Sequence, residues 1–293
     1  MTHRTLRMAI YAMLAGGALL LSAGTSQGAE VYVVRFWTDI VYSSPTECYR
    51  VGWRDHLVFR NTTNQDLAVS AVAASNGYTV PGPEQLVIPP RGTRSVLIQP
   101  RFSEGGSTNL WAPKPENTFI VNRLDVPQGI IVESRGELWG PLATTLPCPP
   151  PEPGGVPASE VFGTIPLPVV RSLVPAGTEH TYLATDLGTQ PIRTNVGIYN
   201  AGAAASNVAI ELRRSCDDAV IERRFTVVPA NAVVQVTGLA DTPRTSGTSC
   251  SSSGSTYYSR YVAVLMDQAG FSFVTILSSD LPPRIAITTS AAH

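Results

Sequence analysis

The sequence predicts an all-β protein in which two antiparallel β-sandwich domains follow one another as products of an internal duplication. Apolar and polar residues alternate in short segments such as 207–213, and no segment keeps the 3.6-residue apolar period of a helix. The chain contains 24 Pro and 24 Gly, which suit turns between short strands. The segment NVGIYNAGAAASNVAIELRRS at 195–215 has a weaker earlier copy, HLVFRNTTNQDLAVSAVAAS, at 56–75.

The two copies begin with related segments. Residues 30–44 predict one long strand, or two strands with a bend, and include the triplet VVR at 33–35. The same triplet occurs at 169–171, so we align the segment around it with the start of the first copy.

The two copies also continue and end alike. Each has a strand, a Pro-containing turn and another strand, with Pro89 and Pro229 in the turns. Each closes with a pattern that predicts a β-hairpin, at 117–138 and at 259–280. About seven short strands per copy favour an antiparallel sandwich.

The order of the segments divides the chain into four parts. Residues 1–29 form a predicted signal peptide, because two Arg precede an apolar stretch and small residues precede the cleavage site expected after Ala29. The first sandwich is expected at 30–140, a Pro-rich linker at 141–160 and the second sandwich at 161–293. We therefore expect export to the periplasm, the cell surface or the medium, with no membrane span in the mature form.

The charge balance argues against nucleic-acid binding. The chain has 21 Lys and Arg against 22 Asp and Glu, and removal of the signal peptide takes away two Arg and no acidic residue, which leaves a net charge of −3. Binding to nucleic acid or anionic lipid calls for a basic excess.

Four cysteines, all in the predicted mature part, indicate disulfides. An even number of cysteines in an exported chain favours disulfide bonds over metal binding, and no CxxC spacing occurs. Three pairings are possible, and the expected domain boundary selects Cys48 with Cys148 and Cys216 with Cys250, one bond in each domain.

The second half, above all RTNVGIYNAG, TVVPANAVVQVTGL and YVAVLMDQAGFSFVTILSSD, resembles the immunoglobulin-like repeats of large exported bacterial proteins. The resemblance covers 161–288 well and 30–140 more loosely. It implies immunoglobulin-like sandwiches that act as spacers, adhesive modules or appendages, and it implies no catalytic residue. The sequence departs from antibody-type domains because it lacks their mid-strand Cys…Trp…Cys pattern.

Motifs for catalysis or for metal and cofactor binding are not found in the sequence. His56 corresponds to Asn195 of the other copy, which predicts a polar, solvent-facing strand position rather than a general base, and no GxSxG motif occurs. Asp217 and Asp218 could contribute to a Ca²⁺ site, but a polar turn explains them more simply. We expect no enzyme activity, no cofactor and no metal.

Aromatic residues in two loops are the candidate ligand contacts. Trp111 lies in a Gly-, Ser- and Pro-rich loop of the first copy, and Tyr257 and Tyr258 lie at the matching place in the second. Such rings can form a platform for a sugar or a peptide, although core or loop packing is the alternative. Asn61 and Asn200 are expected to be structural, as residues that tolerate left-handed turns.

Together these patterns predict an exported, non-catalytic binding or structural module with a surface, adhesion or spacer role. Its expected partner is another exported protein or a surface polysaccharide. The alternative is a periplasmic assembly chaperone that completes a partner's sheet with an edge strand. A sandwich-fold hydrolase is the third possibility.

Overall fold

Strands and turns make up the part of the chain that the structure describes. The structure is a computed structural model and describes residues 28–43, 48–77, 85–98, 118–140, 160–184, 192–239, 250–252, 255–257, 260–278 and 285–289. Within these ranges the protein is all-β, every strand pair is antiparallel, and there is no helix. No helix of the described residues is therefore long and apolar enough to cross a membrane.

The strands fall into two sets in chain order. The first set comprises β1 (Ala29–Ser43), β2 (Cys48–Asn61), β3 (Leu67–Ala74), β4 (Gln85–Ile88), β5 (Thr93–Ile98), β6 (Thr118–Val126), β7 (Ile130–Gly140), β8 (Glu160–Pro166) and β9 (Val169–Val170). The second set comprises β10 (Glu179–Ala184), β11 (Ile192–Asn200), β12 (Ser206–Arg214), β13 (Val220–Val228), β14 (Ala232–Val236), β15 (Cys250–Ser252), β16 (Ser255–Tyr257), β17 (Arg260–Met266), β18 (Gly270–Ser278) and β19 (Ile285–Thr289).

The long strand β1 connects two sheets of the first set. Its residues 29–37 pair with β6, and its residues 38–43 pair with β2, so one strand passes from one sheet to the other. Of the two alternatives expected for 30–44, one long strand or two strands with a bend, the structure shows one long strand. We call the side with the order β5-β2-β7-β8 sheet I and the side with the order β4-β3-β6-β1 sheet II.

The second set repeats this strand order in two separate sheets. Sheet III has the order β14-β11-β18-β19, which matches sheet I, and sheet IV has the order β13-β12-β17-β10, which matches sheet II. The strands β15 and β16 form a small two-stranded sheet apart from these four.

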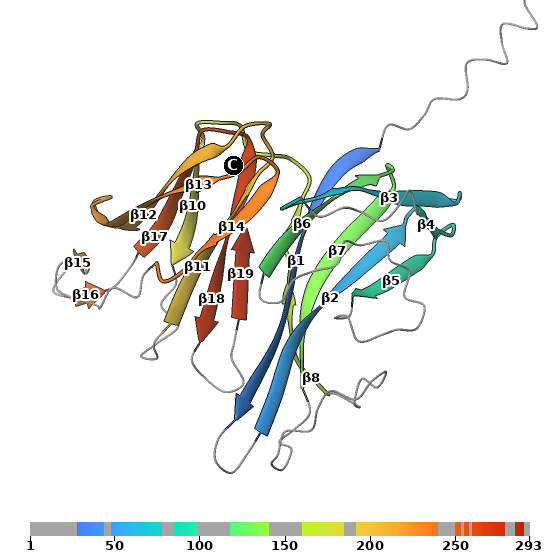
Figure 1. Cartoon of the computed structure of the whole chain (residues 1–293), viewed down its shortest axis with the longest axis horizontal. Helices are drawn as coiled ribbons and strands as arrows, with labels where there is room; N and C mark the ends of the chain where they lie inside the picture. Colours follow the sequence, from blue (N-terminus) through green and yellow to red (C-terminus); the bar gives the residue numbers. More distant parts are fainter. Residues whose placement is uncertain are drawn as a thin grey trace, which may run out of the picture.

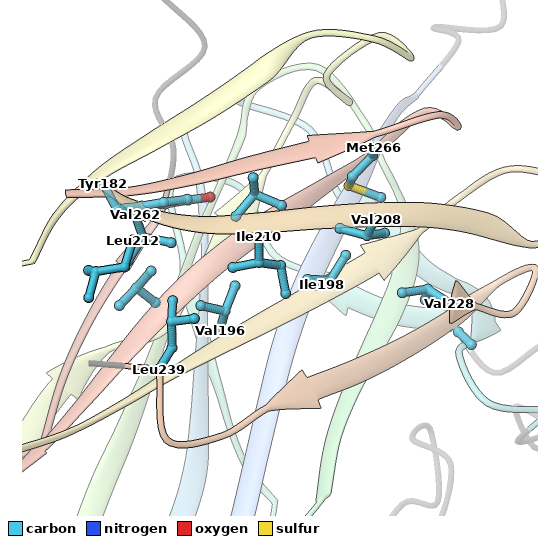
Figure 2. Packing of buried hydrophobic residues seen from close by; sticks show 13 residues of the cluster. Tyr182, Val196, Ile198, Val208, Ile210, Leu212, Val228, Leu239, Val262 and Met266 are labelled. Atoms are coloured by element: carbon cyan, nitrogen blue, oxygen red, sulfur yellow. The ribbon is translucent and has the colours of Figure 1, made fainter. Parts of the chain in front are cut away.

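The four sheets stack as layers in the order I, II, III, IV, with an apolar core in each of the three gaps. Figure 1 shows the middle of this stack, where β11, β14, β18 and β19 lie between the layer of sheet IV and strands β1 and β6. Between sheets I and II, buried side chains such as Val33, Leu57 and Leu124 pack together. Between sheets III and IV, the core includes Ile198, Ile210 and other side chains drawn in Figure 2. Alternation along each strand produces these cores, because successive side chains point to opposite faces.

The middle core joins the two sets of strands and is rich in aromatic rings. Tyr32 of β1 lies 5.7 Å from Tyr199 of β11, and Phe119 of β6 lies 5.0 Å from Phe273 of β18, between ring centroids. A Cβ atom at position 197 would overlap the end of the Phe273 ring, so the glycine there lets this ring lie directly against β11. Apolar side chains therefore point both ways from β1, with Val33 in the first core and Tyr32 and Val34 in the middle one.

Two expectations about connections were wrong. The segments 117–138 and 259–280 are not hairpins, because β6 and β7 lie in sheets II and I, and β17 and β18 lie in sheets IV and III. Alternation and a short turn identify two strands but not whether they pair, since the same turn can cross from one sheet to the next.

The alignment of the VVR triplets was also wrong. Val169 and Val170 form β9, which pairs with Val33 and Tyr32 of β1 itself. The strand that takes the place of β1 in the second set is β10, because it pairs with β17 as β1 pairs with β6. The chain from 160 to 170 thus pairs with strands of the first set, through β8 on β7 and β9 on β1. The expected division at 141–160 falls largely outside the described residues and stays a prediction.

Asn61 and Asn200 have the same structural role in the two sets. The Asn61 Nδ2 donates to the carbonyl oxygens of Gln65 and Ile88, at 2.7 and 3.0 Å. The Asn200 Nδ2 donates to those of Ala204 and Val228, at 2.8 and 3.0 Å. Both side chains are buried. Neither residue has a positive φ, so the expected reason for their importance was wrong: each amide fastens the following turn and a second strand end.

Candidate functional site

A groove on the outer face of sheet IV is a concave surface lined largely by apolar side chains. Leu265 of β17, Ala209 of β12 and Phe225 of β13 lie opposite one another in a row across the sheet. The small Ala209 forms the floor, and the two larger side chains rise on either side. Strands lie about 4.8 Å apart, so the two walls stand on strands about 10 Å apart. The groove has a volume of about 510 Å³.

The walls of the groove are unusually exposed for apolar side chains. Phe225 is 75% exposed, Val227 is 58% exposed and Leu265 is 43% exposed. A single exposed apolar residue needs no explanation, but neighbouring ones that line a hollow mark interaction surfaces. Met266 and Val208, whose side chains belong to the core, complete the lining from below.

A carboxylate closes one end of the groove. Asp267 accepts hydrogen bonds from the Ser206 hydroxyl (2.9 Å), from the backbone N–H of Asn207 (2.9 Å) and from the Asn207 side-chain amide (2.7 Å). These hydrogen bonds, first that of the Asn207 side chain, lower the pKa of Asp267 below its ordinary value. The carboxylate therefore stays charged at this end, with both oxygens already engaged by neighbours.

A network of charged side chains lies beyond the other end. Glu211 of β12 accepts from the Nε atoms of Arg213 (2.7 Å) and Arg223 (2.6 Å). Burial acts to raise the pKa of Glu211, but the hydrogen bonds from the two guanidinium groups outweigh it and lower that pKa. Arg213 also contacts Glu179 at 2.8 Å. The groove is thus an apolar strip between two polar ends.

A second cluster of functional groups lies on the outer face of sheet I. His56 of β2 contacts Glu137 of β7 through Nδ1, at 2.8 Å from Oε1, and contacts the Ser95 hydroxyl of β5 through Nε2. Arg135 of β7 approaches the same Nδ1 from its Nε at 3.1 Å, and its Nε lies 3.6 Å from Glu137 Oε1. The His56 and Glu137 side chains are 18% and 12% exposed.

Sequence analysis missed this cluster. His56 was expected at a polar, solvent-facing position with no role as a base, and it does lie on the outer face, but against Ser95 and Glu137. The three residues come from separate strands and meet only because the order β5-β2-β7 and its register place them diagonally across three neighbouring strands. No spacing in the sequence signals such a meeting.

Two of the three cores contain polar groups that the sequence did not single out: the first core, between sheets I and II, and the second core, between sheets III and IV. In the first, the buried Arg35 donates from Nε to Asp55 (3.4 Å) and from Nη1 to Asn122 (3.1 Å), and burial lowers the pKa of this guanidinium. In the second, the Ser272 hydroxyl contacts His180 Nδ1 at 2.8 Å and the Tyr182 hydroxyl at 2.6 Å. Burial lowers the pKa of His180.

The disulfide expectation is confirmed for one pair. Cys216 and Cys250 are bonded, with their Cα atoms 5.9 Å apart, and the bond ties the turn after β12 to β15. Cys48 begins β2, but its side chain and all of Cys148 lie outside the described part of the protein. The Cys48–Cys148 bond therefore stays a prediction.

The expected ligand contacts lie mostly outside the described residues. This holds for Trp111 and Tyr258, while Tyr257 is the last residue of β16 and its side chain is not described. Asp217, considered for Ca²⁺, contacts Arg214 at 2.5 Å. Among the described residues no three His, Cys, Asp or Glu side chains gather as they would around a metal ion.

Comparisons with known proteins add little. No family model matches the chain, and no curated protein matches it. Two solved structures of a lectin from Pleurotus ostreatus, one in complex with GalNAc and one in the apo form, are similar at 11% identity. They cover 93% and 92% of this chain and 80% and 79% of their own, each with a TM-score of 0.13. A TM-score this low carries no argument about fold or function.

Proposed function

We propose that this protein is an exported binding module of two immunoglobulin-like sandwiches, and that it holds a protein partner in the groove on the outer face of sheet IV. The observation that carries the proposal is the row of exposed apolar side chains, Leu265 and Phe225 on either side of Ala209. The confirmed Cys216–Cys250 bond supports export, because disulfides persist in oxidising compartments.

The repeated strand order supports an origin by duplication and an immunoglobulin-like arrangement. Sheets I and III share one order and sheets II and IV another. The Asn at the end of the central strand recurs, and so does a positive φ in the turn after Pro89 and Pro229, at Arg91 and Asn231. The orders β8-β7-β2 and β1-β6-β3 match the G-F-C and B-E-D strand orders of immunoglobulin domains.

The chemistry of the groove favours a protein over a polysaccharide. A sugar needs several hydrogen-bonding groups free to meet its hydroxyls, but three of the about four acceptor sites of the Asp267 carboxylate are already used by Ser206 and Asn207. The walls are one phenyl ring and aliphatic side chains, which suit the apolar side chains of a protein. Arg223, half exposed beyond the groove, suits an acidic residue next to such side chains.

The chaperone alternative requires an edge strand that is free to accept a partner's strand. In sheet IV β13 lies at the edge, but it carries Glu222, Arg223 and Arg224 in succession. Charged residues on an edge strand oppose the addition of another strand. We therefore favour binding on the face of the sheet over completion of a partner's sheet.

The test is to isolate a stoichiometric partner from the native envelope and medium and to measure its affinity for variants. Phe225→Ala and Leu265→Ala should each weaken binding at least tenfold, as expected for central interface residues. Val87→Ala is the matched control, because Val87 is 50% exposed on β4, at the place that Val227 has on β13.

Unchanged affinity for both groove variants, or the absence of any protein partner together with binding to a glycan array, would overturn the proposal. A transient complex with a subunit that lacks a strand of its own would support the chaperone instead.

A further inference from the structure

Serine hydrolases activate a serine hydroxyl through a histidine that contacts a carboxylate. The side chains of Ser95, His56 and Glu137 contact one another in this order. The Ser95 hydroxyl contacts His56 Nε2, and Glu137 contacts the other ring nitrogen at 2.8 Å. In such a relation the carboxylate orients the imidazole and the imidazole takes the proton of the hydroxyl. We propose that Ser95 is an acyl-accepting nucleophile, with His56 as its general base and Glu137 as the group that orients His56. This activity goes beyond the binding function and does not depend on it.

The contacts of His56 decide which ring nitrogen carries the proton. A carboxylate oxygen 2.8 Å from Nδ1 is favourable only when Nδ1 bears a hydrogen. The neutral ring then presents the lone pair of Nε2 to the Ser95 hydroxyl, as a base must. Arg135 also reaches Nδ1 with donor groups, at 2.9 and 3.1 Å, and would favour the opposite tautomer.

The greater exposure of Arg135 resolves this conflict. Its side chain is 45% exposed, whereas that of Glu137 is 12% exposed, so the guanidinium moves away from Nδ1 at less cost than the carboxylate does. A small shift would turn Arg135 towards Glu137, whose Oε1 already lies 3.6 Å from its Nε. This ion pair would leave the Nδ1–H of His56 to the Glu137 carboxylate.

The second set of strands supports a specific role for the cluster. The residues at the places of Ser95, His56 and Glu137, judged by strand pairing, are Gln235, Asn195 and Leu277. The fold therefore forms in sheet III without a serine, histidine and carboxylate at these places, so the strand pairing does not require them in sheet I.

The reaction would proceed in two balanced steps. The Ser95 Oγ forms a bond to the acyl carbon while its proton passes to His56 Nε2, and the ester C–O bond breaks as His56 returns the proton to the leaving alkoxide. Water then attacks the acyl-serine with the same base and releases the acid. We assign no oxyanion donor among the described residues, so we expect turnover of activated esters rather than of peptide bonds.

The experiment uses the whole mature protein with p-nitrophenyl acetate as substrate and a fluorophosphonate as label, in which Ser95 Oγ displaces fluoride from phosphorus. Peptide mapping should place the label on Ser95. Ser95→Ala should lose the label and the hydrolysis, and His56→Gln should lower both at least 100-fold. Glu137→Gln should lower both less strongly, with a folded spectrum retained.

Matched controls lie on the same outer face of the same strands. Thr93→Ala on β5 and Glu133→Gln on β7 change exposed residues beside the cluster and should leave labelling and hydrolysis as in the unaltered protein. The proposal fails if the unaltered protein is not labelled at Ser95. It also fails if Ser95→Ala or His56→Gln hydrolyses the ester at the original rate.

Discussion

Sheets II and IV share the same strand order and register, yet the faces that they turn away from their own sandwich cores differ in chemistry along one corresponding row. In sheet II this is the face that also packs against sheet III through the middle core. In sheet IV the row across three strands is Leu265, Ala209 and Phe225. In sheet II the corresponding row is Asp125, Ser70 and Gln85, paired in the same way on β6, β3 and β4. One row is polar and the other apolar, although the backbone pairing is shared.

This difference shows that the fold does not require an apolar row. Asp125, Ser70 and Gln85 lie on paired strands with no apolar side chain among them, so this strand pairing does not by itself call for Phe225 and Leu265 in sheet IV. Exposing a phenyl ring to water has a cost that the polar row avoids. A partner that covers the ring would remove this cost, which is the physical reason for proposing the binding face on sheet IV.

The first core, between sheets I and II, and the second core, between sheets III and IV, also differ in chemistry at corresponding places. At the places of Val31, Val33 and Val132 in the first core, the second core has His180, Tyr182 and Ser272, judged by strand pairing. The second core therefore contains a buried, hydrogen-bonded polar group where the first is apolar. Shared features and differing features of the two sets should respond differently to mutation.

The largest effect is expected where the two sets are alike. Asn61→Ala and Asn200→Ala each remove a buried amide that holds several backbone groups, including the N–H of Thr63 or of Gly202 at 2.8 Å. Leaving such groups unpaired costs about 2–4 kcal/mol in the free energy of unfolding. Urea unfolding should show similar losses for the two variants.

The control is Asn64→Ala, which changes an exposed residue of the same turn and should cost less than about 0.5 kcal/mol. A loss at only one of Asn61 and Asn200 would show that the two turns are held differently, despite their matching hydrogen bonds.

The sequence predicted the features that depend on residues near one another in the chain, and it did not predict those that depend on pairing between strands. Alternation identifies strands, and the repeated Asn-containing segments predict two sets of strands with matching order, because both signals are local. The hairpins expected at 117–138 and 259–280 were wrong because pairing between strands is not local. The groove and the Ser95–His56–Glu137 cluster escaped prediction for the same reason, since each joins side chains of three strands through their register.

A smaller effect, confined to acid, is expected where the cores differ. Burial lowers the pKa of His180 in the folded protein below the value of about 6.5 in the unfolded chain. The unfolded state then binds more protons below this pH, so stability is full above it and falls as the pH decreases. Each unit of difference between the two pKa values is worth about 1.4 kcal/mol.

His180→Gln removes the titration and leaves a side chain that can still hydrogen-bond to Ser272. Comparison of urea unfolding at pH 7.5 and at pH 5 should show a smaller loss in this variant than in the unaltered protein. Asn64→Ala, which changes no titratable group, should retain the acid sensitivity. An equal loss with and without His180 would assign the acid sensitivity to other groups.

The smallest effect is expected at a turn that the two sets share but fill with different residues. Arg91 and Asn231 both have a positive φ, 54° and 49°, and Asn adopts this conformation more readily than Arg. Arg91→Asn loses only an exposed hydrogen bond to Asn64, so it should raise the free energy of unfolding by about 0.5 kcal/mol. Arg91→Ala, which keeps the strain and loses the same hydrogen bond, should give no gain in urea unfolding. A gain with Ala as large as with Asn would mean that the Arg side chain itself, and not its backbone conformation, lowers the stability of this turn.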